Sequence, residues 1–214
     1  MALLELDDIG ISFGGLRAVD GVSFSVEDGE VFSIIGPNGA GKTTVFNLIS
    51  RIYDCDTRRI RFDGRDISRI APHAVPRAGI ARTFQNINLF EHSTVLENLM
   101  LGRYRHDRVN LLQQLVFSGA VKRERIADRA KVEEVIEFLE IEKHRDKLVD
   151  GLPYGVRKVI ELGRALATGP RLLLLDEPSS GLNPEETDDL IFWIEDMARD
   201  LDITVLMIEH DMNL

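Results

Sequence analysis

The stretch GPNGAGKT, residues 36–43, restricts what this chain can fold into more than any other part of its sequence. It follows an apolar run, VFSII over residues 31–35, which predicts a buried strand. It precedes VFNLISRI over residues 45–52, where apolar residues recur at the spacing of a helix that packs on a sheet. These apolar residues are Val45, Phe46, Leu48, Ile49 and Ile52. Strand, glycine loop and helix in this order predict an α/β fold.

This loop also predicts a phosphate-binding site. Its backbone N–H groups can surround phosphate oxygens, and the N-terminus of the following helix adds positive potential. Lys42 is expected to reach the β- and γ-phosphates of a nucleotide, and the Thr43 hydroxyl is expected to bind Mg²⁺. A glycine-rich turn without a ligand is the alternative, and the strand before the loop and the helix after it argue against that alternative.

A second apolar run, RLLLLDEP over residues 171–178, supplies carboxylates. Its leucines predict a buried strand that carries Asp176 to its C-terminal end, where ligands of open α/β sheets bind and where a carboxylate can hold Mg²⁺. Glu177 is then placed to activate an attacking water as a general base. An acidic pair that merely caps a helix is the alternative.

Further strands and helices surround these two motifs. The run ITVLMIEH over 203–210 predicts another central strand of a parallel sheet, and a helix from Pro184 to about Arg199 joins it to the first. Another helix is expected from Pro153 to Ala167. Short strands are expected at LLELDDI (3–9), VSFSV (22–26) and RRIRFD (58–63), and helical periodicity dominates residues 95–148. One helical face there is expected to hold Ile126, Val132, Val135, Ile136 and Leu139.

Three single residues have both a functional and an ordinary interpretation. His210 ends the ITVLMIE strand and is either an exposed histidine or a donor to the γ-phosphate. Gln85 in ARTFQN is either a surface amide or a ligand to Mg²⁺ or the attacking water. Phe13 in ISFGG is either a core aromatic or a platform on which adenine stacks. The presence of the glycine loop favours the functional interpretation of each.

Composition excludes several classes of protein. The net charge of −10 disfavours a broad electrostatic surface for nucleic acid. With one cysteine, Cys55, no intrachain disulfide can form, which fits a reducing cytosol. No run approaches the roughly 20 apolar residues that cross a bilayer, and the N-terminus MALLELDDIG is acidic where a secretory signal is basic. A role at a membrane would therefore require a partner protein.

The order of FGG, GPNGAGKTT, RTFQN, LPYG, LLLLDEP, SSGLNP and IEHD resembles the nucleotide-binding subunit of an ABC transporter over essentially the whole chain. The segments GLRAVDGVSF, GIARTFQNINLFEHSTVLENLMLG and IEHDMNL resemble the ATPases of branched-chain amino-acid importers, the LivG type. The resemblance implies an α/β P-loop NTPase with a RecA-like, mostly parallel core sheet, an N-terminal antiparallel β subdomain and an inserted α-helical subdomain.

The same resemblance implies one ABC ATPase domain over residues 1–214, with a core of 1–87 and 160–214 and a helical subdomain at about 88–159. Relatives continue past residue 214 with a further strand and helix, so a C-terminal truncation is expected. Glu177, His210, Gln85 and Lys42 are the implied catalytic residues, and Thr43, Gln85 and Asp176 the implied metal ligands. The implied cofactors are ATP and Mg²⁺. The implied nucleotide-binding residues are Phe13, Gly36, Pro37, Asn38, Gly39, Ala40, Gly41, Lys42, Thr43, Thr44, Leu152, Pro153, Tyr154, Gly155 and Val156.

The resemblance also implies partners. Such ATPases form head-to-tail homodimers or heterodimers in which ATP lies between the P-loop of one subunit and the signature motif of the other, and the loop Ser180–Asn183 connects the two sites. Permease subunits would hold the dimer at the cytoplasmic face of the cell membrane, through a groove near residues 86–104, and a solute-binding protein would act indirectly. No nucleic-acid partner is expected.

The implied function is ATP-driven uptake of branched-chain or other small polar amino acids. One alternative is an ABC ATPase for another solute, such as urea or short amides. Another is a non-transport ABC ATPase in DNA maintenance, which the acidic charge and short helical insertion disfavour. A regulatory subunit that hydrolyses ATP poorly is a third, disfavoured by Lys42, Glu177 and His210.

The signature motif departs from the usual LSGGQ of the family. Pro153 replaces the serine, Tyr154 the first glycine and Val156 the glutamine. Loss of the serine hydroxyl removes one γ-phosphate donor, which costs about 1–3 kcal/mol if its partner is left without a hydrogen bond. Gly155 keeps its backbone N–H, so we expect the helix N-terminus at this position to retain its contact with phosphate.

Overall fold

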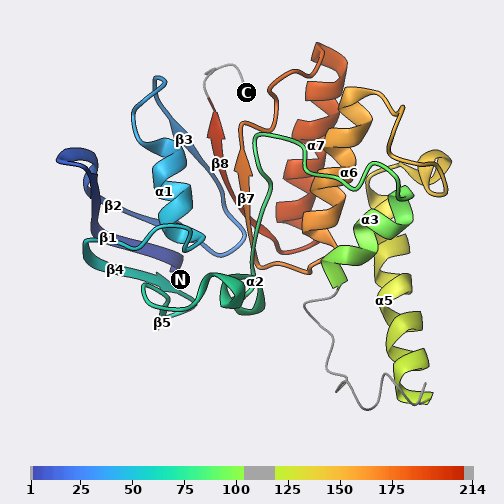
Figure 1. Cartoon of the computed structure of the whole chain (residues 1–214), viewed down its shortest axis with the longest axis horizontal. Coiled ribbons are helices and arrows are strands. Elements are labelled where there is room, and N and C mark those ends of the chain that lie inside the picture. Colours follow the sequence, from blue (N-terminus) through green and yellow to red (C-terminus); the bar gives the residue numbers. More distant parts are fainter. Residues whose placement is uncertain (1, 104–118, 210–214) are drawn as a thin grey trace. The chain divides into compact units, whose positions relative to one another are not determined.

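The computed structural model describes residues 2–103 and 119–209 (Figure 1). The chain divides into two compact units. The core unit comprises Met1–Gln85 and Arg171–Leu214, and the helical unit comprises Asn86–Pro170. In the described ranges, no helix combines the length and the apolar character needed to cross a membrane.

A parallel sheet of the core unit has the strand order β3-β8-β7-β6. β7 (Leu172–Asp176) is buried along its whole length, and β8 (Thr204–Glu209) is buried at every position except Met207. Each of these two strands pairs with a neighbour on both sides. The prediction that the two apolar runs are central strands of a parallel sheet is therefore confirmed. β6 (Ile80–Arg82) is a short strand that pairs with β7.

The predicted strand over residues 31–35 is present as β3 (Val31–Ile35), but the prediction that it is buried is wrong. β3 pairs with β8 on one side, and no other strand of the described residues pairs with its second side. Val31 is 38% exposed and Ile35 is 49% exposed. A continuous apolar run is typical of parallel strands, but the run does not reveal whether the strand is central or at an edge.

An antiparallel sheet of the core unit has the order β2-β1-β4-β5. β1 (Ala2–Phe13) and β2 (Leu16–Glu27) form one hairpin that contains both short strands predicted near the N-terminus, so those predicted strands were too short. Gly14 and Gly15 connect the strands, with φ of 51° and 87°. Two left-handed residues make the two-residue turn that matches the twist of a hairpin. β4 (Thr57–Phe62) confirms the predicted strand near residue 60, and β5 is Arg65–Asp66.

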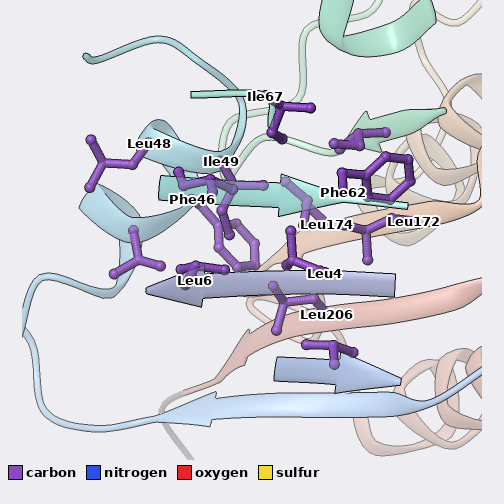
Figure 2. Close-up of a cluster of buried hydrophobic side chains, with 14 of the residues drawn as sticks. Leu4, Leu6, Phe46, Leu48, Ile49, Phe62, Ile67, Leu172, Leu174 and Leu206 are labelled. Carbon is purple, nitrogen blue, oxygen red and sulfur yellow. The ribbon is translucent and has the colours of Figure 1, made fainter. Parts of the chain in front are cut away.

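The first long helix, α1 (Lys42–Ile49), places Phe46, Leu48 and Ile49 in the apolar core (Figure 2). The core also takes leucines from both sheets, namely Leu4 and Leu6 of β1, Leu172 and Leu174 of β7 and Leu206 of β8. The prediction that Ile52 lies on the same buried face is wrong, because Ile52 is 48% exposed. The helix ends at Ile49, and Arg51 adopts a left-handed conformation with φ 60° that turns the chain away.

The remaining helices of the core unit connect strands. The short helices η1 (Pro72–Ala74) and α2 (Val75–Ala78) lead into β6. α7 (Pro184–Asp200) joins β7 to β8, and its bounds agree with the predicted helix to one residue. Asn183 caps α7, because its side chain accepts from the Glu186 N–H while the Glu186 carboxylate accepts from the Asn183 N–H. This reciprocal capping box fixes where the helix begins.

The helical unit contains α3 (Val95–Leu101), α5 (Gly119–Phe138), η3 (Glu142–His144) and α6 (Tyr154–Leu166). The predictions of helices in the middle of the chain and after Pro153 are confirmed. A Cβ atom added to Gly163 would lie 3.0 Å from Leu139 and 3.3 Å from Leu99. Glycine therefore lets α6 lie close to α3 and to the end of α5.

One apolar residue predicted on the buried face of α5 lies elsewhere. Val132, Ile136 and Leu139 are buried, as predicted, whereas Ile126 is 60% exposed. With 3.6 residues per turn, Ile126 and Val132 are about a third of a turn apart around the helix and lie on different faces. The prediction that Ile126 shares the buried face is therefore wrong.

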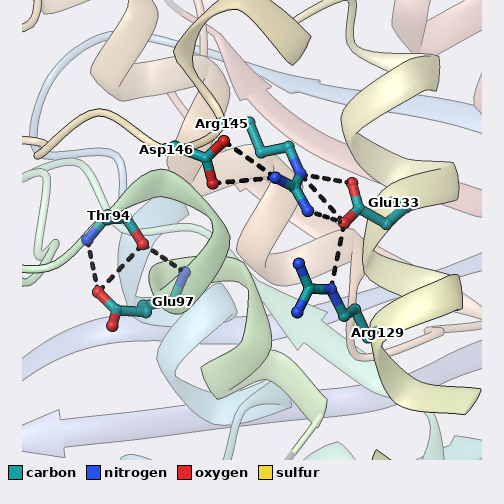
Figure 3. A network of polar contacts seen from close by, with 6 residues as sticks. All are labelled: Thr94, Glu97, Arg129, Glu133, Arg145 and Asp146. Carbon is teal, nitrogen blue, oxygen red and sulfur yellow. Dashed lines mark hydrogen bonds and ion pairs between the residues drawn. The ribbon is translucent and has the colours of Figure 1, made fainter. Parts of the chain in front are cut away.

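Charged side chains hold the segment after α5 (Figure 3). The Arg145 Nε atom donates to both carboxylate oxygens of Glu133 at 3.0 and 2.9 Å, and its Nη1 atom donates to Asp146 at 2.9 Å. Arg129 Nε lies 3.5 Å from Glu133. The hydrogen bonds from Arg145 lower the pKa of Glu133 below its ordinary value, because they stabilise the ionised carboxylate.

The start of α3 is held by its own capping box in the same view. The Thr94 hydroxyl accepts from the Glu97 N–H at 3.2 Å, and the Glu97 carboxylate accepts from the Thr94 N–H at 2.7 Å. The next two N–H groups, of Val95 and Leu96, donate to the carbonyls of Lys147 and Arg145 at 3.1 and 3.0 Å. The chain itself therefore supplies partners for the first donors of this helix.

Candidate nucleotide site

A cavity of ≈ 330 Å³ lies over the glycine loop of the core unit. Its wall includes the loop, the first turn of α1, the start of β2 and one carboxylate. The lining residues are Leu16, Arg17, Ala18, Asn38, Gly39, Ala40, Gly41, Lys42, Thr43, Thr44 and Glu177. Most of the residues predicted from the P-loop pattern thus share one cavity, and Glu177 reaches it from a segment more than a hundred residues away.

Lys42 is the first residue of α1 and is buried. Its ammonium group donates to the carbonyl oxygen of Gly36 and, at 3.0 Å, to that of Pro37. Gly36 and Pro37 do not line the cavity, but through these bonds they hold the lysine head against the loop. The position of Lys42 matches the predicted one, at the start of a helix that follows a strand.

Gly41 precedes α1 at the N-cap position with φ 84°, and no side chain caps the helix there. A Cβ atom at Gly41 would lie 2.5 Å from the carbonyl oxygen of Ala18 in β2. Glycine is therefore required both by the left-handed backbone and by the neighbouring strand. The backbone N–H groups at the start of α1 consequently border the cavity without a side-chain cap.

Asp176 ends β7, and its side chain is 3% exposed. Its Oδ2 atom accepts from Nη2 of Arg82 at 2.8 Å. Its Oδ1 atom is buried and has no hydrogen-bond partner among the described residues. A buried carboxylate oxygen without a partner is costly, by about 1–3 kcal/mol or more for a charged group. A cation at Oδ1 would remove this cost, so this atom fits the predicted role of metal ligand.

Glu177 follows with φ 51°, a left-handed conformation that is uncommon outside glycine, asparagine and aspartate. Its N–H donates to the Ile208 carbonyl of β8 at 3.0 Å, which holds the strained backbone in place. Its Oε2 atom accepts from Nε2 of Gln85 at 2.9 Å. The structure therefore brings Gln85 and Glu177, two predicted catalytic residues, into direct contact.

Phe13 lies at the end of β1, directly before the Gly14–Gly15 turn. Its ring is 43% exposed, so the alternative that it is a core aromatic is wrong. The ring makes an edge contact with Tyr53, with 5.1 Å between the ring centroids. Leu16 and Arg17, just past the same turn, line the cavity. The exposed ring of Phe13 is therefore three residues before Leu16, which belongs to the wall of the cavity.

The predicted signature segment, Leu152–Val156, belongs to the helical unit. Pro153 occupies the N-cap position of α6 and provides no side-chain hydrogen bond, and the helix begins at Tyr154. Gly155 is buried, whereas Tyr154 is exposed and its ring lies 5.9 Å from the Lys158 ammonium group. The segment is thus a helix start, as predicted. His210, the remaining predicted catalytic residue, lies outside the described residues.

Sequence reasoning missed two buried charged residues beside this site. Arg82 binds Asp176, as described above. Glu209 ends β8 and is buried, and its carboxylate accepts from the N–H and the hydroxyl of Ser179 at 3.2 and 3.1 Å. Glu209 thereby ties the loop after Glu177 to the end of β8. The available signal was a charged residue at the end of a short apolar strand, IAR for Arg82 and TVLMIE for Glu209.

Known proteins are similar to this chain in sequence. The chain is 42% identical over 215 residues to the high-affinity branched-chain amino acid transport ATP-binding protein BraF of Pseudomonas aeruginosa. It is 35% identical over 212 residues to the corresponding protein LivG of Salmonella typhimurium. Each alignment covers 99% of this chain and 83% of the relative.

Solved structures agree with these relatives. A nucleotide-free ATP-binding cassette from an ABC transporter matches with a TM-score of 0.85 and 34% identity. The ADP conformation of MJ1267, an ATP-binding cassette of an ABC transporter, matches with a TM-score of 0.86 and 35% identity. Each match covers 100% of this chain and 83% of the other.

The predicted P-loop NTPase fold is confirmed by these structural matches, by the parallel and antiparallel sheets of the core unit and by the separate helical unit. A family model described as ABC transporter matches residues 19–180, a span that includes the glycine loop, Gln85, the signature segment and the acidic pair Asp176 and Glu177. The chain therefore belongs to the ABC transporter family.

Proposed function

We propose that this chain is the ATP-hydrolysing subunit of an ABC importer that takes up branched-chain or other small polar amino acids. The observation that carries the proposal is the cavity over the P-loop, whose wall includes Lys42, Thr43 and Glu177. The identity of 35–42% to branched-chain amino acid transport ATP-binding proteins, over 99% of this chain, supports the substrate class.

In the proposed complex, ATP binds along the loop with its phosphates at the start of α1. The Lys42 ammonium exchanges its bonds to Gly36 and Pro37 for phosphate oxygens, a stronger charge-assisted interaction. Backbone N–H groups from Asn38 to Thr44 complete the phosphate site. Phe13, exposed at the end of its hairpin, stacks on the adenine ring.

The residues at the end of β7 fit a magnesium ion. Oδ1 of Asp176 is buried without a hydrogen-bond partner among the described residues, and the exposed Thr43 hydroxyl lines the cavity. Carboxylate, hydroxyl and amide oxygens are ligands that Mg²⁺ prefers, and Gln85 supplies an amide. When bound, Mg²⁺ neutralises charge on the phosphate oxygens.

Glu177 is proposed as the general base. One carboxylate oxygen accepts a proton from water as the water oxygen attacks the γ-phosphorus, and the bond to the β-phosphate oxygen breaks to release ADP and phosphate. The hydrogen bond from Gln85 orients this carboxylate. His210 is proposed as a donor to the γ-phosphate. Motion of the Gln85 segment would thus change the position of the base.

A second subunit completes the proposed site. The Leu152–Val156 segment at the start of α6 would contact the γ-phosphate bound by a partner subunit, either a copy of this chain or a related ATPase. ATP would favour the closed dimer because the γ-phosphate contacts exist in that state and not in the open one. Permease subunits at the cytoplasmic face of the membrane would receive this motion, and a solute-binding protein would act through them.

The substitution Glu177→Gln tests the proposal. With ATP and Mg²⁺ it should trap a dimer measurable by size-exclusion chromatography and light scattering, while ATP hydrolysis falls by about 10²- to 10⁴-fold because the base is lost. The exposed Glu185→Gln in α7 is a matched control that should behave as wild type. A Glu177→Gln protein that stays monomeric at saturating ATP and Mg²⁺ would count against the proposed mechanism.

A further inference from the structure

Arg82 makes a buried set of contacts that the proposed mechanism has not yet used. It ends β6, and its side chain is 6% exposed. The Nη2 atom donates to Oδ2 of Asp176 at 2.8 Å, and the Nη1 atom donates to Oδ1 of Asn47 at 2.7 Å and to Oγ of Ser50 at 2.9 Å. One guanidinium group thus joins the strand that carries Asp176 to the helix that follows the P-loop.

Two aromatic rings fix the orientation of this guanidinium. Its central carbon lies 5.4 Å from the centroid of the Phe46 ring and 5.1 Å from that of the Phe84 ring. Arginine has a planar fork of donors that is suited both to stacking and to simultaneous hydrogen bonds. With two rings close to its central carbon and both Nη atoms bonded, the side chain has little rotational freedom. The position of Oδ2 of Asp176 is fixed with it.

The hydrogen bonding at Asp176 is asymmetric. A buried ion pair is favourable only when the remaining lone pairs are also satisfied, and a fully structural Arg–Asp pair would be expected to use both oxygens. Here Oδ1 is buried and has no hydrogen-bond partner among the described residues, and neither does Nε of Arg82. The guanidinium therefore does not form a bidentate pair with this carboxylate. It holds one oxygen and leaves the other available.

We propose that Arg82 is a positioning residue for the metal of the nucleotide site, because it binds Oδ2 of Asp176 and presents Oδ1 to the ion as a single ligand. This inference rests on the proposed role of Asp176 as a magnesium ligand. Mg²⁺ requires near-ideal octahedral geometry and usually takes one or two carboxylates, so a carboxylate fixed in advance suits it. Partners that orient a ligating carboxylate typically change metal affinity by about 10- to 100-fold when removed.

Arg82 also contacts the helix that follows the P-loop and lies close to Gln85 in the sequence. Asn47 lies on α1, which begins with the phosphate-binding Lys42, and Ser50 is the residue that caps the C-terminus of this helix. Gln85 follows Arg82 by three residues. A displacement of the Gln85 segment that moved Arg82 would therefore rotate the Asp176 carboxylate. Arg82 would in this way link the position of the segment to the affinity for the metal.

The test compares Arg82→Gln and Arg82→Lys with the wild-type protein. ATP affinity is first measured by calorimetry in EDTA, without metal. Thermal unfolding at saturating ATP is then followed as free Mg²⁺ is raised, which gives the Mg²⁺ concentration for half of the stabilisation. Asp176→Asn is the reference for a lost carboxylate oxygen. Arg103→Gln is the matched control, because Arg103 Nε binds Asp128 Oδ1 at 2.8 Å in a largely buried pair of the helical unit.

We expect the half-stabilising Mg²⁺ concentration to rise by about tenfold in Arg82→Gln. It should rise less in Arg82→Lys, since an ammonium keeps the charge but cannot hold Asp176, Asn47 and Ser50 in one fixed geometry. ATP affinity in EDTA should stay at the wild-type value in both variants. Arg103→Gln should lose thermal stability but keep the wild-type dependence on Mg²⁺. If circular dichroism shows that Arg82→Gln does not fold, the comparison with wild type is made with Arg82→Lys.

Two results would overturn the inference without affecting the proposed function. The first is a wild-type dependence on Mg²⁺ in folded Arg82 variants while Asp176→Asn is impaired. The second is an equal loss of ATP affinity with and without Mg²⁺, which would mean that Arg82 acts by holding α1. If the wild-type protein and Asp176→Asn show the same response to Mg²⁺, the proposed metal site fails and the inference fails with it.

Discussion

Four helix starts in this chain are of two kinds. α3 and α7 begin with capping boxes, formed by Thr94 with Glu97 and by Asn183 with Glu186. α1 and α6 begin at Gly41 and Pro153, and neither start has a side-chain hydrogen bond to the first turn. The first N–H groups of any helix lack partners within the helix, so something else must satisfy them.

The difference separates helix starts that stabilise the fold from those assigned to phosphate. In α3 and α7 the chain supplies the missing hydrogen bonds itself, and a ligand there would have to displace the Thr94 hydroxyl or the Asn183 side-chain oxygen. In α1 and α6 the residues at the cap position are those of the P-loop and of the signature segment. The absence of a side-chain cap does not by itself indicate a phosphate site, because the short helix α2 also has none. In the proposed function, ATP would complete the starts of α1 and α6.

The largest effect is expected from removing the cation at the uncapped start of α1. Lys42→Ala should weaken ATP binding by about 10- to 100-fold, because a hydrogen bond to a charged group is worth about 1.5–3 kcal/mol. Calorimetry with ATP measures the change. Lys42→Arg is the control that keeps the charge and should retain more affinity than alanine. Unchanged affinity in Lys42→Ala would contradict the assignment of this helix start to phosphate.

Removal of a capping box should lower the stability of the fold and leave ATP affinity unchanged, the opposite of what is expected for Lys42→Ala. Thr94→Ala should lower the free energy of unfolding by about 1 kcal/mol, since the Glu97 N–H loses its acceptor. ATP affinity should not change. Chemical denaturation gives the first quantity and calorimetry the second. Thr94→Ser keeps a hydroxyl and should be close to wild type, and a weaker binding of ATP in Thr94→Ala would show that the two kinds of helix start are not separate.

The signature segment allows the opposite change, the addition of a side-chain oxygen. Pro153→Ser should promote ATP-driven dimerisation of the Glu177→Gln protein by about threefold, a modest gain for one hydrogen bond at a phosphate that other groups already contact. Analytical ultracentrifugation at several protein concentrations measures it. Pro153→Ala separates the gain of a hydroxyl from the loss of proline. Equal dimerisation of the serine and proline forms would mean that Gly155 and the helix start suffice.

The smallest effect concerns acid sensitivity near the capped start of α3. The pKa of Glu133 is lowered by its hydrogen bonds to Arg145. Its stabilising contribution is therefore fully present above the unfolded pKa of about 4.5 and is lost as pH falls through the lower folded pKa. The denaturation midpoints of wild type and Glu133→Gln should differ at about pH 7 and converge towards about pH 3. A difference independent of pH would exclude this ion pair as its cause.

Much of the fold could be predicted because continuous apolar runs and cap residues report local structure directly. The apolar runs predicted the strands β7 and β8, and the helix predicted from Pro184 is α7. The exposure of β3 could not be predicted, because it depends on which strands pair with it. Gly14 and Gly15 form a two-glycine turn signal, from which the length of the first hairpin can be predicted.

The residues of the candidate site are also of two kinds, those that could be predicted from the sequence and those that could not. Lys42, Asp176 and Glu177 follow from spacing within single motifs, and the structure places them beside the P-loop cavity or at the end of β7. Arg82 and Glu209 were missed because their importance arises from contacts with distant segments, which no local pattern contains. Such residues can be identified only when the structure shows which distant segments they contact.

The glycines of the P-loop differ in what the chain can tolerate. Gly39 and Gly41 have nearly the same backbone, with φ of 83° and 84°. No atom lies within 4 Å of a Cβ placed at Gly39, whereas the Ala18 carbonyl blocks one at Gly41. In a library of single substitutions scored for folding, asparagine should therefore survive at residue 39, since it tolerates a left-handed backbone. Residue 41 should not accept it, and β2 thus constrains how the loop can diverge over evolutionary time.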